Sequence, residues 1–416
     1  MTDIPINADR LWQSLMDMAV VGKIGATGCC RLALTDADTA GRQLFLDWAK
    51  DAGCTAVYDD VGNLFVRRSG ANPQLPPVVM GSHLDTQANG GRFDGVLGVL
   101  AGLEVLRSLN DHDVVTQHPL EVAVWTNEEG VRFSPAMMGS GVFAGVFDVD
   151  AVRHTADDDG ITVAQALAQQ GVQGDCLHRN RPLAAYLELH IEQGPILEHQ
   201  GKRIGVVQGV QGIRWYDLRM LGVATHAGPT PMAMRVDAAE AAGRAIGEIM
   251  AIGRCDEYAR ATVGKIHFAP GSRNVVPDRA DLSIDLRHPD PVVLERMHQR
   301  LEQSMQALAA SQEGLEANLE EVWHSPPVVF DQRLVSMVSQ NARALGLDAM
   351  NIVSGAGHDA VYVSRVAPTA MVFIPCQGGV SHNPDEQVDP RDVQAGAQVL
   401  ARTVLQLAGS VPTPLT

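Results

Sequence analysis

Four apolar runs of the sequence are each followed closely by side chains that can bind a metal ion. The runs are residues 77–80, 121–125, 185–189 and 371–374, and the side chains after them are His83 with Asp85, Glu128 with Glu129, His190, and, after a glycine-rich loop, His382. In an open parallel sheet, ligands bind outside the carboxyl ends of the strands. If the runs are strands of such a sheet, these side chains meet at one edge. Asp94, just before a predicted helix, can reach the same edge.

The donor set indicates which ions could bind there. It comprises three imidazoles and two carboxylates, with no thiolate: His83, Asp94, Glu129, His190 and His382. Such a set suits Zn²⁺ first, and also Mn²⁺, Co²⁺ or Ni²⁺. Five ligands are too many for one tetrahedral catalytic ion that keeps a water, but they fit two ions bridged by one carboxylate. Each residue alone has an ordinary structural explanation, and only their joint placement favours a dinuclear metal site.

Other chemistries find less support in the sequence. The glycine-rich loops lack the spacing of a Walker or dinucleotide-binding motif, so they predict no phosphate site. The six cysteines show no CxxC spacing, which is typical of reduced thiols in a cytoplasmic protein. Neither they nor the remaining histidines give a nucleophile–base pair that could compete with the metal site.

The elements that must position these residues follow an alternating pattern. Helical spacing of apolar residues at 9–18, 40–51 and 95–109 is interleaved with the apolar runs described above. Strands separated by helices predict an α/β fold with a mostly parallel sheet covered on both faces. A helix at 334–345 and the run at 370–374 continue this pattern near the end of the chain.

Between these segments the pattern changes. Residues 214–220, 262–266 and 281–287 resemble strands of an antiparallel sheet, and 236–252 and 292–310 resemble two helices. This predicts an inserted α+β domain, two helices on an antiparallel sheet, at 212–328. Residues 1–211 and 329–416 would together form a discontinuous catalytic domain, and the insert would serve as a lid or a dimerisation domain.

Composition narrows the choice of partner and compartment. The 416 residues are 45% hydrophobic and 19% charged, as in ordinary globular proteins, and carry a formal charge of −17. That charge argues against nucleic acid or an anionic membrane as a partner. The first residues show no secretory signal, and no run of 18 apolar residues is present, so we expect a cytoplasmic protein that does not span a membrane.

At these residues the sequence resembles the zinc-dependent amidases of the hydantoinase/carbamoylase family. This family contains N-carbamoyl-L-amino-acid hydrolases, bacterial β-ureidopropionases and allantoate amidohydrolases, and belongs to a clan with aminoacylases and di-zinc carboxypeptidases. The matching segments are GSHLDTQANGGRFDGVLGVLAGLEVL, TNEEGVRFSPAMMGSG, ELHIEQGPILE, THAGPTPMAMRVDA, RNVVPDRADLSIDLRH, SGAGHDA and FIPCQGGVSHNPDE. They run from residue 81 to 386, across both predicted domains.

The resemblance implies a role for each candidate in the catalytic domain. The five donors would be the metal ligands, and Asp94 would bridge two ions. His190 is typical of the carbamoylase branch, because the peptidase relatives have a carboxylate there. Glu128 would act as general base and then as general acid, and Asp85 would orient the imidazole of His83.

The resemblance also implies contacts with a small anionic substrate. Arg287, with Asn274 and Arg214, would hold the substrate carboxylate, since a guanidinium fork matches a carboxylate. Gln193 and the backbone at Gly357 are weaker candidates for substrate binding. His226 would stabilise the oxyanion in the site of a neighbouring subunit, which implies a homodimer.

The implied reaction is the hydrolysis of N-carbamoyl (ureido) acids to an amino acid, ammonia and carbon dioxide. The substrates would be N-carbamoyl-L-amino acids or N-carbamoyl-β-alanine, and an allantoate amidohydrolase is the first alternative. His190 makes a di-zinc aminopeptidase or aminoacylase less favoured. A catalytically silent binding protein on this fold would have no use for Glu128 beside a full ligand set.

Overall fold

The computed structural model describes residues 4–410 of the chain. It contains two compact units: Gly209–Val329 forms one, and the segments before and after it together form the other. We call these the inserted unit and the outer unit. Their limits fall at Gln208 and Phe330, whereas the sequence placed them after residues 211 and 328.

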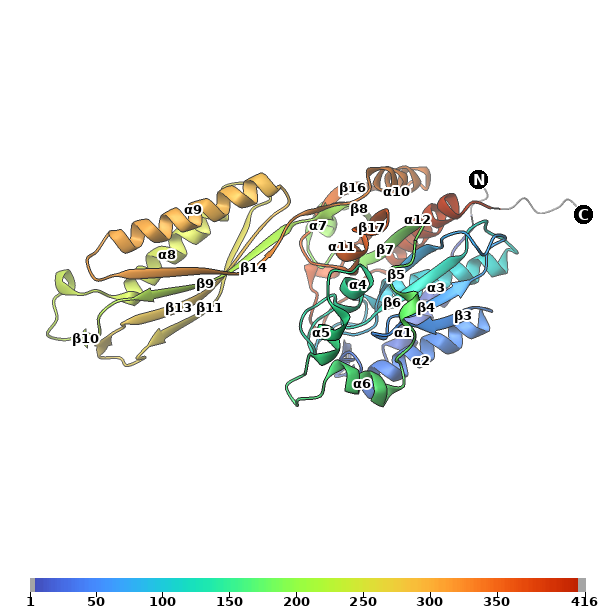
Figure 1. Ribbon diagram of the computed structural model, residues 1–416. Coiled ribbons are helices and arrows are strands. Elements are labelled where there is room, and N and C mark those ends of the chain that lie inside the picture. The colour runs from blue at the N-terminus through green and yellow to red at the C-terminus, as the bar shows by residue number, and fades with distance from the viewer. Residues whose placement is uncertain (1–3, 411–416) are drawn as a thin grey trace, which may run out of the picture. The chain divides into compact units, whose positions relative to one another are not determined.

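The outer unit is built around a nine-stranded sheet (Figure 1). The strand order is β15-β8-β17-β7-β5-β6-β4-β3, and β16 pairs with β8. The strands are β3 (Thr55–Tyr58), β4 (Leu64–Arg68), β5 (Val78–His83), β6 (Leu120–Trp125), β7 (Ala185–Ile191), β8 (Ile204–Val210), β15 (Val328–Val329), β16 (Ala349–Ser354) and β17 (Thr369–Ile374). Neighbours within β17-β7-β5-β6 are parallel, and β8, β4 and β3 join them antiparallel. The mostly parallel sheet predicted from the sequence is confirmed.

Helices cover both faces of this sheet. A Cβ at Gly396 in α12 (Pro390–Ala408) would lie 2.7 Å from the side chain of Leu189, and α3 (Val96–Asp111) packs on α12, β5 and β7. On the other side, the backbone N–H of Ala360 in α11 (Asp359–Val363) donates to Glu188. Successive strand residues point to opposite faces, so α12 and α11 lie on opposite sides of β7.

The remaining elements of the outer unit are shorter or lie at its periphery. They are α1 (Ala8–Met18), α2 (Asp36–Asp51), α4 (Met138–Phe143), α5 (Val149–His154), α6 (Val163–Gln170), α7 (Ile196–His199), α10 (Gln332–Ala344), the strand pair β1 (Lys23–Ile24) and β2 (Gly28–Cys29), and 3₁₀ turns at Cys176–His178 and Gln377–Gly379. Side-chain caps explain several helix starts: Asn7, Thr35 and Asp389 each accept an N–H from the first turn of their helix.

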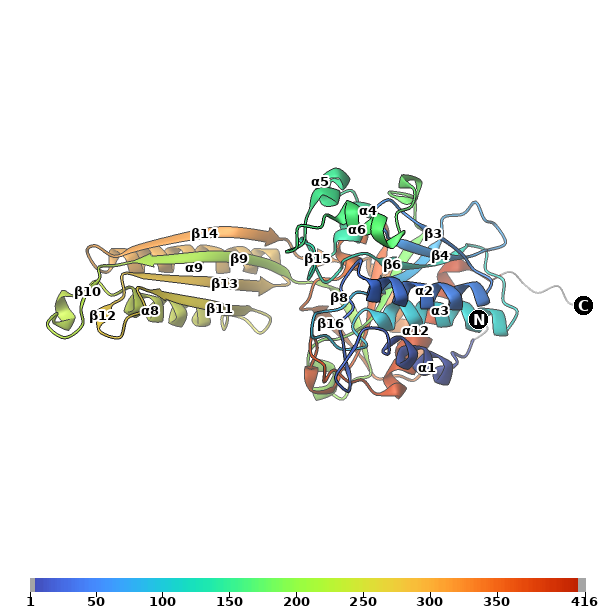
Figure 2. The ribbon, with the colours of Figure 1, turned by 90° about the horizontal axis from the view of Figure 1, so that it is seen from below.

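The inserted unit is a four-stranded antiparallel sheet with two helices on one face (Figure 2). The strand order is β11 (Arg260–Ala269), β13 (Arg279–His288), β9 (Gly212–Leu221), β14 (Glu316–Ser325), and the helices are α8 (Ala238–Ile252) and α9 (Pro291–Ala310). A short pair, β10 (Thr225–His226) and β12 (Val275–Val276), extends beyond the Leu221 end of β9.

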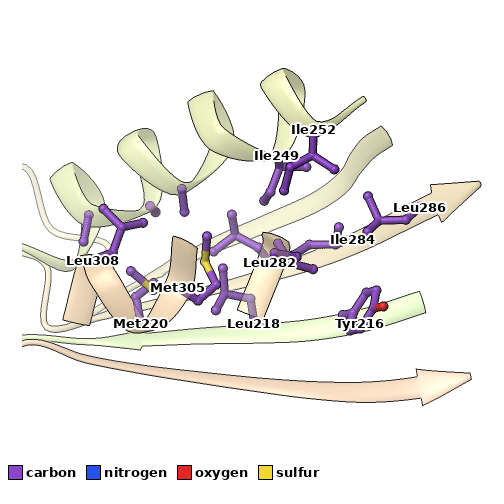
Figure 3. Close-up of a cluster of buried hydrophobic side chains, with 14 of the residues drawn as sticks. Tyr216, Leu218, Met220, Ile249, Ile252, Leu282, Ile284, Leu286, Met305 and Leu308 are labelled. Atoms are coloured by element: carbon purple, nitrogen blue, oxygen red, sulfur yellow. The ribbon is translucent and has the colours of Figure 1, made fainter. Parts of the chain in front are cut away.

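Alternation along the strands explains why the helices cover only one face. Tyr216, Leu218 and Met220 of β9 are buried, while the residues between them are exposed. Figure 3 shows these side chains meeting Leu282 and Ile284 of β13 under the helices. A sheet with one apolar face and one polar face is typical of antiparallel pairing.

The structure also adds elements that the sequence reading missed. Among the strands, β8, β14, β16 and the edge pair β3 and β4 were not predicted, and neither was the long helix α12. The strands β5 and β7 extend further than predicted, so that His83 and His190 lie within their last residues. No helix within residues 4–410 is long and apolar enough to cross a membrane.

Candidate metal centre

Asp94 lies at the centre of a buried cluster at the carboxyl edge of the parallel strands. Its Oδ1 atom is 3.1 Å from Nε2 of His190, at the end of β7, and 3.8 Å from Nε2 of His83, at the end of β5. Its Oδ2 atom is 3.3 Å from Nε2 of His382, which in turn is 3.4 Å from Oε2 of Glu129. The two oxygens of Asp94 therefore face two different sets of donors.

Each set brings its donor atoms within reach of one ion. The atoms of His83, Asp94 and His190 all lie within 4.8 Å of one another, and so do those of Asp94, Glu129 and His382. All five sequence-predicted donors are thus brought together, and Asp94 is the member that the two sets share. Imidazole and carboxylate donors at this spacing are candidate ligands for a pair of metal ions.

The backbone orients two of the imidazoles toward Asp94. Nδ1 of His83 lies 2.8 Å from the carbonyl oxygen of Asp85, and Nδ1 of His190 lies 2.9 Å from that of Ile191. An Nδ1–H that donates to a carbonyl leaves the lone pair of Nε2 available to a metal. We expected the side chain of Asp85 to orient His83, and this is corrected: the main chain of Asp85 makes the contact.

The carboxylate of Asp85 instead fixes the backbone of the two adjacent glutamates. Its oxygens accept the N–H of Glu128 at 3.2 Å and of Glu129 at 3.1 Å. The segment that leads into α4 holds this backbone as well, because the N–H of Met137 donates to the carbonyl of Glu128 at 2.7 Å. The result places Oε2 of Glu128 at 3.5 Å from Nε2 of His83, beside the first donor set.

A glycine is required beside the first donor set. Gly95 has φ of +70°, and a Cβ there would lie 2.3 Å from the His83 ring. Any other residue would collide with the imidazole and would be strained in this backbone conformation. Gly95 also donates its N–H to Nε2 of His190 at 3.2 Å, so the start of α3 is fixed against both histidines.

Burial and crowding displace the pKa values of the carboxylates. Burial, followed by repulsion from Asp359 and Glu129, raises the pKa of Glu128 well above its usual value. Burial and the charge of Asp94 raise the pKa of Glu129 to about 8. Burial also acts on Asp94, but hydrogen bonds with His190 and His382 outweigh it and hold its pKa well below the usual range.

The imidazoles respond in different directions. Burial lowers the pKa of His83 to about 4, so this ring is neutral and able to donate its lone pair. The pKa of His190 is raised to about 9, because interaction with Asp94 outweighs burial. The hydrogen bond with Asp94 likewise raises the pKa of His382 to about 9. A divalent cation would relieve this crowding of carboxylates, so the residues present fit a metal pair.

Gln193 and Gly357 also lie at this edge. The amide nitrogen of Gln193 donates to Oδ2 of Asp94 at 2.8 Å, while its buried Oε1 has no hydrogen-bond partner among the described residues. Gly357 directly precedes His358, whose ring packs edge-on against His190 at 4.5 Å between centroids. Gln193 therefore contacts a candidate ligand directly, in addition to any role toward a substrate.

A buried polar layer beneath the centre was not anticipated. Glu188 accepts hydrogen bonds from Ser82 at 2.8 Å, from Tyr186 at 3.2 Å and from the N–H of Ala360 at 3.1 Å. One signal for it was present in the sequence: Glu188 is an acidic residue in an apolar strand, two positions before His190. The two-residue period of a strand places both on one face.

The inserted unit does not gather its candidate residues in one place. Arg287 and Arg214 lie at the Gly212 end of β9, where Arg287 pairs with Ile213 and Arg214 with Leu286. Facing residues share a side of the sheet, so the two arginines point to opposite sides. Arg214 is under the helices, 2.5 Å from Glu295 and 2.9 Å from Glu321, and Arg287 contacts Asp285 at 2.7 Å. The expectation that both hold one carboxylate is corrected for this arrangement.

His226 and Asn274 lie together at the other end of the same sheet. His226 pairs with Val275 across β10 and β12, and the carbonyl of Asn274 accepts the N–H of Ala227 at 2.9 Å. From Ile213 to Leu221 a strand extends roughly 26 Å, at about 3.3 Å per residue. His226 and Arg287 of one inserted unit are therefore too far apart to contact the same small molecule.

These features define a two-unit α/β fold with two candidate metal-ligand sets that share Asp94, and comparison with known proteins identifies its family. Residues 79–406 match the peptidase family M20/M25/M40, and the chain belongs to this family.

Particular members are similar over nearly the whole chain. An N-carbamoyl-L-amino-acid amidohydrolase of Rhizobium meliloti is 45% identical over 404 residues, 97% of each chain. An allantoate amidohydrolase of Bacillus subtilis is 36% identical over 361 residues, 86% of this chain and 87% of the relative. The crystal structure of a hydantoinase/carbamoylase family amidase from Burkholderia multivorans matches with 50% identity and a TM-score of 0.95, covering 98% of this chain and 99% of that one. The predicted family and fold are confirmed.

Proposed function

We propose that this protein hydrolyses the linear amide of N-carbamoyl (ureido) acids, giving an amino acid, ammonia and carbon dioxide. The substrates would be N-carbamoyl-L-amino acids or N-carbamoyl-β-alanine. The observation that carries the proposal is Asp94, whose two oxygens face separate donor sets beside the buried Glu128. The similarity to an N-carbamoyl-L-amino-acid amidohydrolase supports this choice of substrate class.

The cofactor in this proposal is a pair of divalent cations, with Zn²⁺ first and Mn²⁺, Co²⁺ or Ni²⁺ as alternatives. His83, Asp94 and His190 would hold one ion, and Asp94, Glu129 and His382 the other. When bound, the pair would polarise the amide carbonyl and acidify a water molecule. The ions would also set a positive local potential, which lets a chain of formal charge −17 accept an anionic substrate.

Glu128 is the proposed proton carrier. Burial and neighbouring carboxylates raise its pKa, which favours the protonated form. A bound cation would compensate their charge and favour the carboxylate that can accept a proton. Glu128 takes a proton from the attacking water and returns it to the leaving nitrogen of the amide. Glu129, although adjacent in sequence, faces His382 and is proposed as a ligand.

The substrate carboxylate is assigned to Arg287, with Gln193 as a further polar contact and Gly357 as a backbone contact. Asn274 lies beside His226 at the other end of the sheet, so it is proposed to meet a substrate only together with His226, in the partner's site. Arg287 lies on the sheet face that the helices leave open, and its side chain is 28% exposed. Arg214 was grouped with it, but its ion pairs beneath the helices support a structural role more than a contact with substrate.

We further propose a homodimer in which His226 completes the partner's site as an oxyanion donor. Because His226 and Arg287 are far apart within one inserted unit, they are proposed to act in two different active sites of the dimer. His226→Ala and Glu128→Ala chains should each be nearly inactive alone. After subunit exchange, half the dimers are hybrids with one intact site, so about a quarter of wild-type activity should return. A mixture that exchanges subunits and stays inactive would overturn this arrangement.

Allantoate is the second candidate substrate, favoured by the similarity to the allantoate amidohydrolase of Bacillus subtilis. The deciding experiment measures ammonia release from a panel of N-carbamoyl-α-amino acids, N-carbamoyl-β-alanine and allantoate with metal-reconstituted protein. The proposal expects the highest kcat/KM for an N-carbamoyl acid. Preference for allantoate would assign the second function, and no release from any of them would reject both.

A further inference from the structure

Two loops from distant parts of the sequence carry Asp94 and His382 of the second donor set, and the loop after β6 carries the third member, Glu129. Asp94 ends the loop that follows β5, and His382 lies in the loop between β17 and α12. His382 has φ of +53°, and its side chain is 50% exposed. His83 and His190, in contrast, are held by strands. Something other than regular secondary structure must fix the distance between Asp94 and His382.

Glu386 is the residue that joins these loops. It is fully buried, with 0% of its surface exposed. Its Oε1 accepts the backbone N–H of Phe93 at 2.9 Å and that of Asp94 at 3.1 Å. Its Oε2 accepts the hydroxyl of Ser381 at 3.0 Å, and Ser381 also lies 3.1 Å from Oδ2 of Asp94.

Glu386 is closely packed against the loop that carries Asp94. A Cβ added at Gly91 would lie 2.2 Å from Oε1 of Glu386, so only glycine fits at that position. The next residues of the two loops are also joined, because Arg92 donates to the side chain of Gln387 at 3.1 Å. Glu386 therefore contacts the backbone of one candidate ligand, Asp94, and the side chain of Ser381, which precedes the other, His382.

We propose that Glu386 is a positioning residue that sets the spacing between Asp94 and His382, and with it the affinity for the second cation. The inference rests on the proposed function, because it assumes that these residues bind metal. Both carboxylate oxygens of Glu386 are taken up by backbone N–H groups and by Ser381, so it acts through Asp94 and Ser381. Loss of such an outer partner typically lowers metal affinity by about 10- to 100-fold.

The two donor sets should respond unequally. His83 and His190 keep their places through β5, β7 and the carbonyls that accept from Nδ1. His382 has no such support from a strand: it lies on a loop, and its ring lies near the side chains of Asp94, Glu129 and Gln193. The Glu386→Ala variant should therefore bind one ion with little change and the other about 10- to 100-fold more weakly.

The test is a Zn²⁺ titration against a chelating indicator, with chelator-stripped protein and no substrate. Glu386→Gln is the conservative variant: its amide oxygen can still accept the two backbone N–H groups and its amide can donate to Ser381, so most of the lost affinity should return. Glu104→Ala is the matched control, since Glu104 is equally buried and accepts from Asn7 and Ser108 along α3, away from the centre. It should leave both affinities unchanged.

The outcomes distinguish failure of the proposed function from failure of the role assigned to Glu386. Wild-type protein that binds no Zn²⁺ would reject the proposed function. Wild-type protein that binds two ions, with unchanged affinities in Glu386→Ala, would reject the role of Glu386 alone. If Glu386→Ala does not fold, as judged by circular dichroism, then Ser381→Ala takes its place. A several-fold loss at one ion would then support the inference, and no loss would overturn it.

Discussion

The parallel sheet of the outer unit and the antiparallel sheet of the inserted unit treat their functional candidates in opposite ways. Residues from β5, β7 and the loops after β6 and β17 meet around Asp94, with donor atoms within 4.8 Å in each set. The candidates of the inserted unit lie at two ends and on two faces of a single sheet. Parallel strands bring their carboxyl ends to one edge, whereas antiparallel strands distribute theirs.

The difference teaches which residues can act as a unit. Buried charges that face one another, as Asp94 and His190 do, are coupled, so removing one disturbs all. Residues on an open sheet face act one at a time. Substitutions of the five candidate ligands in the outer unit should therefore change metal content, while those in the inserted unit should change substrate binding and leave metal content alone.

The largest effect is expected at Asp94, the residue shared by both donor sets. Asp94→Ala should lose both ions and all measurable activity, since each set loses its common member. Elemental analysis after gel filtration measures the ion content. Asp237→Ala is the control from the inserted unit, where Asp237 caps α8 through the N–H of Ala239. If Asp94→Ala retains two ions, Asp94 is not a ligand that the two donor sets share.

The next effect separates the paired glutamates. Glu128→Gln should retain both ions and lose roughly 10²- to 10⁴-fold in kcat, the usual range for a general acid–base group. Glu129→Gln should lose the ion shared with His382. Ion content and kcat are measured on the same preparations. Equal metal loss in the two variants would show that their roles are assigned incorrectly.

A smaller effect is expected in the inserted unit. Arg287→Ala should keep both ions and raise KM roughly 10- to 150-fold, because a charge-assisted hydrogen bond contributes about 1.5–3 kcal/mol. Arg214→Ala should change KM little, since its partners are Glu295 and Glu321. Steady-state kinetics on the preferred N-carbamoyl acid compares the two. Equal rises in KM for the two variants would show that Arg214 also contacts the substrate and would contradict this prediction.

The smallest effect is the pH dependence of metal affinity. In cation-free protein the pKa is about 8 for Glu129 and about 9 for His382, so both carry protons at pH 7. A metal ion must displace these protons, and affinity therefore rises with pH and falls in acid. We expect a decrease of at least about tenfold from pH 7 to pH 6 in Zn²⁺ titrations. A constant affinity over this range would contradict the assignment of both residues as ligands.

Much of the site could be predicted because its ligands follow apolar runs whose strands share one direction. The same reasoning failed for Asp85, since only the folded turn after β5 decides whether a carbonyl or a carboxylate meets His83. It also failed for Arg214 and Arg287, whose opposite faces follow from a register between β9 and β13 that no local pattern contains. Glu386 acts on a residue 292 positions away, which leaves no local trace.

The fold shows the same division. Helices α3 and α9 could be predicted because their apolar residues recur at helical spacing within the segment itself. The strand β14 was missed because consecutive glutamates interrupt its alternation, and the structure has a register shift there, between Glu321 and Trp323. The strand β3 is exposed at a sheet edge, so its sequence carries little apolar signal. In contrast, α12 has a capping Asp389 and Pro390 at its first turn, signals that were available in the sequence.

The position of β17 has a consequence for how the protein is made. This strand lies between β8 and β7 in the sheet, yet it belongs to the last part of the chain. A ribosome must therefore complete the inserted unit, whose pairings all fall within its own segment, before the outer sheet can close. His382 follows β17, so the last of the five candidate ligands is synthesised only after the inserted unit, and α12 follows it. Until then the growing chain holds an open sheet with unpaired strand edges, and it is in this interval that the nascent protein is most exposed to aggregation.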